Sequence, residues 1–340
     1  MNLQTPMLLS LSHLSVSFPV RGGVLMRARR WCQAVRDVSL EVRPGETVGL
    51  VGESGCGKST LGKAIVRLVD AARGSIRFEG FDVTRRRGKA LRPLRRQVQM
   101  VFQDPVESLN PRFSVGDIVA EPFEIHNMGT RKERRMWVEE LLEKVGMPAG
   151  TADRFPFEFS GGQRQRIGIA RAIALKPKIV IADEPVSALD VSVQSQVLNL
   201  LLELQREMGM AYLFIAHDLA VVKHVSDRVA VMYLGEIVET ADAETIYRDP
   251  RHAYTKALLS AIPEPDPVRR RERILLQGDV PSPIDPPEGS AFGHRVGHPR
   301  YAETIGLPMP LVEIAPGHWV RRDPCCLEPA DWDRLKLVPG

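Results

Sequence analysis

Residues 47–60 read Thr-Val-Gly-Leu-Val-Gly-Glu-Ser-Gly-Cys-Gly-Lys-Ser-Thr, and they decide the fold that the rest of the chain has to support. The first five residues form a short apolar run, which predicts a buried strand. The run from Gly52 to Ser59 then fits the pattern G-x-x-x-x-G-K-S. Apolar residues recur at helical spacing over 61–69, so the pattern lies between a predicted strand and a predicted helix. This is the context that a phosphate-binding loop requires.

The residue types of this phosphate loop fit a nucleoside triphosphate. Its glycines let backbone N–H groups turn inward around phosphate oxygens, and the start of the next helix adds the positive end of a dipole. Lys58 supplies a charge for the outer phosphates, and the Ser59 hydroxyl is a ligand for Mg²⁺. A glycine turn that only caps a helix has no use for Gly-Lys-Ser at this spacing. The residues predicted to bind the triphosphate are Gly52, Glu53, Ser54, Gly55, Cys56, Gly57, Lys58, Ser59 and Thr60.

A second apolar run, at 179–182, ends in two acids, Asp183 and Glu184. Ligands gather at the carboxyl edge of open parallel sheets, which is the edge that carries the phosphate loop. Asp183 is predicted to hold Mg²⁺ directly or through water, and Glu184 to orient or deprotonate the attacking water. Acid pairs are also common at solvated strand ends, but the phosphate loop upstream favours the catalytic interpretation.

The run Ser160-Gly161-Gly162-Gln163 predicts a second helix start that can bind an anion, with Ser160 as the N-cap and glycines that leave backbone N–H groups bare. One chain hardly needs two such sites for one γ-phosphate. Two chains packed head to tail do need them, because each then caps the nucleotide of the other. The pattern therefore favours a dimer of ATPases.

The order of these motifs resembles that of ATP-binding cassette (ABC) ATPases, in which the Ser-Gly-Gly-Gln run is the signature motif. Gln103 is similar to the Q-loop glutamine, which touches Mg²⁺ and senses the nucleotide. His217 is similar to the switch histidine, which contacts the γ-phosphate. For the aromatic side chain that stacks on adenine, Phe18 is the first candidate and Trp31 the rival. A D-loop at the dimer interface is implied at Ser187, Ala188, Leu189 and Asp190.

The resemblance also implies the division of roles. The magnesium ligands would be Ser59, Gln103 and Asp183, and catalysis would rest on Glu184, His217 and Gln103. The signature residues would act in trans on the partner's ATP; they are Ser160, Gly161, Gly162 and Gln163.

Within this superfamily the chain resembles the ATP-binding subunits of oligopeptide and dipeptide importers. The likeness rests on Val-Phe-Gln-Asp-Pro at 101–105, Ser-Leu-Asn-Pro at 108–111, His-Ala-Tyr-Thr-Lys-Ala-Leu-Leu at 252–259 and Gly-Asp-Val-Pro-Ser-Pro at 278–283. The resemblance covers roughly residues 8–290. The motif Gln-Met-Val-Phe-Gln-Asp-Pro, from Gln99 onward, is more similar to the second ATPase of the usual importer pair than to the first.

The fold class implied is α/β: a P-loop NTPase core with an antiparallel β subdomain and a helical signature subdomain at about 105–160. Apolar runs at 212–216 and 229–233 predict further strands of a mostly parallel sheet, and 193–208 predicts a long helix. Residues 21–33 are interpreted as a basic loop insertion. Proline becomes frequent beyond Pro263. We therefore expect an ABC ATPase domain at 7–262 and a loop-rich, Pro-rich extension at 263–340, typical of peptide importers.

The function implied is that of an ATPase subunit that energises a bacterial importer of di- and oligopeptides, with ATP and Mg²⁺ as its ligands. The expected partners are a second ABC ATPase in a heterodimer, two transmembrane permeases and an extracytoplasmic solute-binding protein. The chain is expected to be a peripheral subunit at the cytoplasmic face of the inner membrane, without nucleic acid as a partner.

Two alternatives remain open. A non-transport ABC ATPase that acts on nucleic acid would suit the basic run between Arg85 and Arg96, which contains no acid. That run has no interleaved aromatic residues, and a net charge of +4 is too mild a field to argue for nucleic acid. An importer of the same family for nickel, glutathione or another solute would carry a near-identical ATPase.

The four cysteines argue against a disulfide framework. Many related importer subunits have a cysteine-rich tail, which in some holds an iron–sulfur cluster. Here Ser290 and Val296 stand where the first two cysteines are expected, and Cys325 with Cys326 is too few for a four-thiolate site. We therefore expect no cluster. Cys56 lies near a helix N-terminus, which tends to lower the pKa of a thiol, although a small residue filling a tight turn is an equal alternative.

Overall fold

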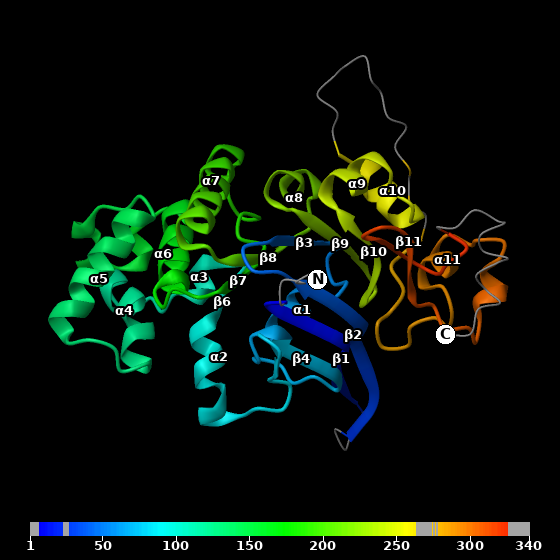
Figure 1. The fold of residues 1–340 in the computed structure, drawn as a ribbon, viewed down its shortest axis with the longest axis horizontal. Helices are drawn as coiled ribbons and strands as arrows, with labels where there is room; N and C mark the ends of the chain where they lie inside the picture. Colours follow the sequence, from blue (N-terminus) through cyan, green and yellow to red (C-terminus); the bar gives the residue numbers. More distant parts are fainter. Residues whose placement is uncertain (1–6, 23–26, 263–273, 275, 277, 326–340) are drawn as a thin grey trace, which may run out of the picture. The chain divides into compact units, whose positions relative to one another are not determined.

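A computed structural model of the chain describes residues 7–22, 27–262, 274, 276 and 278–325 (Figure 1). The chain divides into two compact units. The first unit comprises residues 1–9, 41–47 and 77–216, and the second comprises residues 10–40, 48–76 and 217–340. Among the described residues, no helix combines the length and the apolar character that crossing a membrane requires.

The first unit contains three parallel strands in the order β8-β7-β6. Their bounds are β6 Val98–Val101, β7 Ile179–Asp183 and β8 Ala211–Ala216. Every residue of β7 and β8 is buried, which explains why both strands are continuous apolar runs in the sequence. The strands predicted at 179–182 and 212–216 are confirmed.

Helices surround these strands in the first unit. They are α2 Arg92–Gln97, α3 Pro105–Ser108, α4 Val115–Ile125, α5 Arg131–Lys144, α6 Gly161–Ile173 and α7 Val191–Met208, with short 3-10 helices at Gly88–Leu91, Ala149–Asp153 and Pro156–Glu158. Helix α4 packs against both α5 and α6, and the three lie together in Figure 1. Side-chain caps set two of the starts: Ser114 caps α4, and Thr130 with Glu133 forms a capping box on α5.

Helix α7 confirms the long amphipathic helix predicted at 193–208. Its buried residues are Val197, Leu200, Leu201 and Leu204, which recur at the spacing of one helical face. The helix ends at Gly209, which adopts a left-handed conformation (φ 68°).

The second unit contains a sheet with the order β11-β12-β10-β9-β3. The strands are β3 Thr47–Val51, β9 Arg228–Tyr233, β10 Glu236–Asp242, β11 Leu311–Ala315 and β12 His318–Arg321. Strand β3 runs parallel to β9, and β10 pairs antiparallel with both β9 and β12. The helices of this unit are α1 Lys58–Ile65, α8 Leu219–Val225, α9 Ala243–Arg248, α10 Ala253–Ser260 and α11 Ala291–Arg295, with a 3-10 helix at Tyr301–Thr304.

The antiparallel sheet has the order β2-β1-β4-β5, with β1 Leu9–Gly22, β2 Arg27–Val42, β4 Arg73–Phe78 and β5 Phe81–Asp82. Interpreting 21–33 as a loop insertion was wrong, because β1 extends to Gly22 and β2 begins at Arg27. The arginines suggested a solvated loop. Strand β2 is an edge strand, however, and edge strands tolerate charged residues while their backbone groups pair with the neighbouring strand.

Helix α1 is shorter than the helical spacing over 61–69 predicted. It ends at Ile65, since Arg67 adopts a left-handed backbone conformation (φ 60°). Leu68 consequently points to solvent, with 57% of its surface exposed. The apolar residues of the first two turns, Leu61, Ala64 and Ile65, are buried as predicted for the core face.

The described part of the C-terminal extension contains helix α11 and the strands β11 and β12. Strand β12 pairs with β10 through Glu239 opposite Val320, and β11 pairs with β12 at the edge of the sheet. The extension therefore completes a sheet of the second unit. The domain boundary at 262 stays a prediction.

Candidate nucleotide-binding residues

The phosphate loop connects strand β3 to helix α1, which begins at Lys58. Two of its glycines leave no room for a side chain. A Cβ on Gly52 (φ 156°) would lie 2.1 Å from the carbonyl oxygen of Met232, and one on Gly57 (φ 108°) would lie 2.1 Å from that of Ala34. The backbone at both positions is also one that favours glycine. The loop therefore requires glycine at these two positions, because its backbone lies close to the backbone of Met232 and Ala34.

Lys58 is held inside the loop. Its Nζ donates hydrogen bonds to the carbonyl oxygens of Gly52 (2.6 Å) and Glu53 (3.0 Å), and only 4% of the residue is exposed. These hydrogen bonds hold the charged end of Lys58 within the curve of the loop. The sequence analysis predicted that this charge serves the outer phosphates. This arrangement fits a polyanionic ligand.

Cys56 corrects one expectation. The thiol is buried (2% exposed), and burial raises its pKa although the nearby Lys58 acts to lower it. Desolvation of the thiolate therefore outweighs the charge and hydrogen bonds of Lys58. Of the two interpretations left open by the sequence, the lowered pKa is contradicted and a small side chain filling a tight turn is favoured.

In the first unit, the ends of β6 and β7 bring two predicted catalytic residues together. The Nε2 of Gln103 donates a hydrogen bond of 2.9 Å to Oε2 of Glu184. Glu184 directly follows β7, with a left-handed backbone (φ 46°) and a backbone N–H that donates to the oxygen of Ile215. A left-handed residue other than glycine costs about 1–3 kcal/mol and persists where the surroundings hold it. Asp183, the last residue of β7, is 2% exposed.

The predicted N-cap at Ser160 is confirmed. The N–H of Gln163 donates to Ser160 Oγ (3.3 Å), and the N–H of Ser160 donates to Gln163 Oε1 (3.0 Å). This capping box starts α6. A Cβ on Gly162 would lie 2.4 Å from Cγ1 of Val193, so the contact between α6 and α7 requires a glycine there.

The other predicted site residues are placed by turns and strand ends. The turn after β7 is held by the hydroxyl of Ser187, which donates to the oxygen of Glu184, and Asp190 is the N-cap residue of α7. His217 is exposed and precedes Asp218, the N-cap of α8. Phe18 on β1 and Trp31 on β2 are 39% and 53% exposed, so both adenine candidates stay open.

Two contacts to the phosphate loop were missed by the sequence analysis. The hydroxyl of Tyr254 accepts a hydrogen bond from the N–H of Glu53, and Arg295 forms an ion pair with the Glu53 carboxylate. Tyr254 belongs to the 252–259 run that carries the family resemblance, whereas no local pattern marks Arg295.

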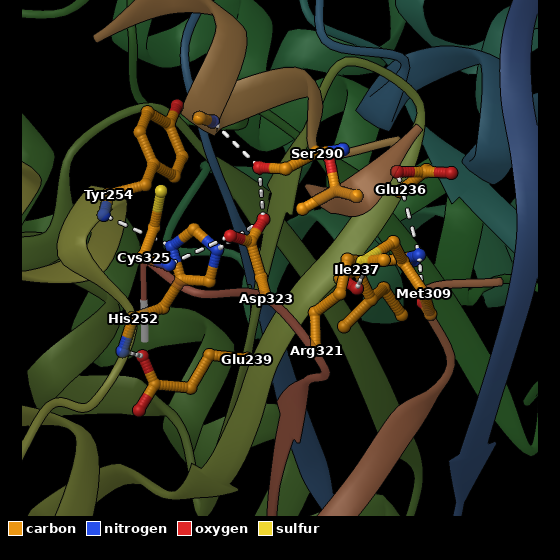
Figure 2. A network of polar contacts seen from close by, with 12 residues as sticks. Glu236, Ile237, Glu239, His252, Tyr254, Ser290, Met309, Arg321, Asp323 and Cys325 are labelled. Carbon is orange, nitrogen blue, oxygen red and sulfur yellow. Dashed lines mark hydrogen bonds and ion pairs between the residues drawn. The ribbon is translucent and has the colours of Figure 1, made fainter. Parts of the chain in front are cut away.

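The tail holds a buried polar network in place of the expected cysteines (Figure 2). Ser290, at the first of those positions, donates a hydrogen bond to Asp323 and accepts one from the N–H of Gly293. Asp323 also accepts from the N–H of Cys325, and burial raises the pKa of the Cys325 thiol. Among the described residues, no three His, Cys, Asp or Glu side chains are arranged to hold a metal ion. Cys326 lies outside the described residues.

Comparison with known proteins defines the class of this chain. Residues 35–187 match the family "ABC transporter", and residues 238–298 match "Oligopeptide/dipeptide transporter, C-terminal region". A solved dimeric ATP-binding cassette, in a post-hydrolysis state with ADP and Pi, is similar with a TM-score of 0.62 and 28% identity; the match covers 69% of this chain and 98% of that one. The chain is therefore an ABC ATPase, as the motifs predicted.

The relatives narrow the class. The putative oligopeptide transport ATP-binding protein YkfD of Bacillus subtilis is 53% identical over 296 residues, which is 86% of this chain and 89% of YkfD. The glutathione import ATP-binding protein GsiA of Pectobacterium atrosepticum is 50% identical over 318 residues, 93% of this chain but 49% of GsiA. The chain belongs to the family of ATP-binding subunits of oligopeptide and dipeptide ABC transporters.

Proposed function

We propose that this chain binds and hydrolyses ATP to energise the import of dipeptides and oligopeptides. One observation carries the proposal: the C-terminal region at 238–298 matches that of oligopeptide/dipeptide transporters, in the same chain as an ABC cassette. As the ATP-binding subunit of a transporter, the chain works with membrane permease subunits.

The phosphate loop, Gly52 to Thr60, binds the phosphates of ATP in this proposal. Two features of the described loop support it: Lys58 is already held within the curve, and Gly52 and Gly57 adopt left-handed backbone conformations in which a Cβ would clash with a backbone carbonyl oxygen. Mg²⁺ would neutralise charge on the outer phosphates. Its ligands would be Ser59, Asp183 and Gln103, whose hydroxyl, carboxylate and amide oxygens are of the kind that Mg²⁺ prefers.

Glu184 is the residue that aligns the attacking water. The hydrogen bond from Gln103 supports this role, because it orients the carboxylate from one side. His217 steadies the charge that develops on the γ-phosphate, so that positioning and electrostatics provide most of the rate. Phe18 or Trp31 stacks on the adenine.

The signature residues Ser160 to Gln163 act on the nucleotide of a second ABC ATPase, with the D-loop, Ser187 to Asp190, at the interface. We propose that this second ATPase is a different chain. The complete importer adds two transmembrane permeases and an extracytoplasmic solute-binding protein, and this chain is peripheral at the cytoplasmic face of the membrane. No observation favours nucleic acid, nickel or glutathione over peptides. The match to YkfD covers 89% of that protein and supports peptides, whereas the match to GsiA covers 49% of its length.

Replacing Glu184 with Gln tests the catalytic role. We expect Glu184→Gln to lower ATP hydrolysis by about 100-fold or more while ATP binding is kept, because the water loses its base but the phosphate loop is intact. Glu203→Gln, at an exposed carboxylate on α7, is the matched control. An unchanged hydrolysis rate in Glu184→Gln would remove Glu184 from this role.

The solute is tested in the complex. The tagged protein is purified gently from its native membranes with its partners, reconstituted in vesicles, and assayed for ATP-dependent uptake of labelled di- and oligopeptides. Peptide uptake that excess glutathione or Ni²⁺ does not inhibit supports the proposal. Recovery with nucleic acid and no permease would contradict it.

A further inference from the structure

An ion pair joins the C-terminal extension to the phosphate loop. Arg295, the last residue of α11, places Nη1 2.7 Å from Oε2 of Glu53 and Nη2 3.3 Å from Oε1. The arginine side chain is 6% exposed and the glutamate side chain 30%. A two-point contact of this kind is more specific than a surface ion pair, because both partners must keep their orientation.

Neighbouring groups hold Arg295 in this position. Its Nε donates to the carbonyl oxygen of Gly278 (3.3 Å), and its guanidinium lies 6.0 Å from the ring centre of Tyr233. Phe292, on the same short helix, packs against the rings of Tyr233 and Tyr254, each with its ring centre at 5.5 Å. Burial opposes the charged form, but Glu53 outweighs it and raises the pKa of Arg295. The arginine is therefore a fixed positive charge.

Glu53 is the one acid in residues 52–60. A carboxylate in a loop that binds a polyanion repels the incoming phosphates unless a cation balances it. The other side of Glu53 is also held, since its N–H donates to the buried hydroxyl of Tyr254 at 2.8 Å. Tyr254 of the ATPase domain thus fixes the backbone of this residue, and Arg295 of the extension fixes its side chain.

We propose that Arg295 is a positioning residue for nucleotide binding: by neutralising and orienting Glu53, the C-terminal extension sets the affinity of the phosphate loop for ATP. The inference rests on the proposed ATP binding and adds a determinant of affinity outside the cassette motifs.

The test measures the Kd of a fluorescent ATP analogue on the full-length chain, in two backgrounds. We expect Arg295→Gln to raise Kd about 3- to 10-fold, because the Glu53 carboxylate is then left unbalanced and repels the phosphates at a partly solvated site. In the Glu53→Gln background, the same replacement of Arg295 should change Kd less than twofold, because no carboxylate remains to be balanced. Added salt should shrink the defect of Arg295→Gln, since salt screens repulsion.

Arg300→Gln is the control, because Arg300 lies in the same extension and forms a two-point ion pair with Glu303, three positions along the chain. An equal loss of affinity in both Glu53 backgrounds would mean that Arg295 acts through the fold, and would overturn the inference. Unchanged affinity in Arg295→Gln would overturn it also, with the proposed function intact. Failure of the unaltered chain to bind the analogue would overturn both.

Discussion

At the scale of single residues, Cys56 and Glu184 owe their properties to their surroundings. The Nζ of Lys58 lies 3.8 Å from the Cys56 sulfur, yet burial is the larger effect on the thiol and raises its pKa. Glu184 keeps a left-handed backbone at the end of β7, and its carboxylate accepts a hydrogen bond from Gln103. Neither the raised pKa of Cys56 nor the held orientation of the Glu184 carboxylate can be inferred from the sequence around the residue.

The raised pKa of Cys56 predicts a slow reaction with alkylating reagents. We expect the chain to keep most of its ATP hydrolysis after brief treatment with N-ethylmaleimide at neutral pH, because the thiolate is the reactive form. Mass spectrometry should find the half-buried Cys32 labelled before Cys56, and labelling of Cys56 should accelerate as the pH rises. Rapid inactivation at neutral pH that ATP prevents would contradict this expectation.

At the scale of elements, the contact between α6 and α7 limits the size of the side chain that the signature helix can carry at position 162. Gly162 lies in the first turn of α6, and its missing side chain makes room for Val193 on α7. Val193 is β-branched and has little freedom to change its χ1 angle in a helix. The signature glycine therefore has a packing role as well as the proposed role at the nucleotide.

Gly162→Ala should lower the free energy of unfolding by about 1–3 kcal/mol, because a methyl group 2.4 Å from Val193 Cγ1 forces one helix to shift. Val193→Ala in the same chain should restore part of the loss. Gly168→Ala is the matched control: it lies in the same helix with nothing within 4 Å of its Cβ, and it should stabilise by about 0.5–1 kcal/mol. Urea unfolding measures all three. Equal effects of the two glycine replacements would contradict the packing argument.

At the scale of the whole molecule, buried polar groups connect the extension to the rest of the second unit. Glu239 on β10 lies 2.8 Å from Nε2 of His318 and accepts hydrogen bonds from the N–H groups of Arg251 and His252. Burial acts to raise the pKa of Glu239, but these hydrogen bonds outweigh it and lower the pKa. Burial also lowers the pKa of His252, although Asp323 and Glu239 act to raise it.

These shifts predict an acid-sensitive fold. A group whose pKa is lowered by folding stabilises the chain above its unfolded pKa and loses that contribution as the pH falls. For His252 the loss begins near pH 6.5. We expect the urea concentration at the midpoint of unfolding to decrease as the pH is lowered below 6.5. In His252→Asn this decrease should be smaller, while the side-chain oxygen of the asparagine still caps α10. Identical pH profiles for His252→Asn and the unaltered chain would contradict the assignment to His252.

Much of the fold could be predicted because its signals are local. The strand predicted at 179–182, the cap at Ser160 and the amphipathic face of α7 depend on residues a few positions apart, and all are confirmed. The segment at 21–33 was wrongly predicted to be a loop because its arginines suggested exposure to solvent. Its strand character depends on pairing with β1, which a local pattern does not reveal.

Residue types at short spacing are enough to identify the phosphate loop, the order of the motifs and, from these, the class of ATPase. Three features become visible in the three-dimensional fold alone: Gln103 donates a hydrogen bond to Glu184, Cys56 is buried, and Arg295 pairs with Glu53 from 242 positions away. The physical reason is the range of the interactions. Turn geometry and periodicity act between neighbours, whereas desolvation and ion pairing depend on which distant segments the fold places in contact.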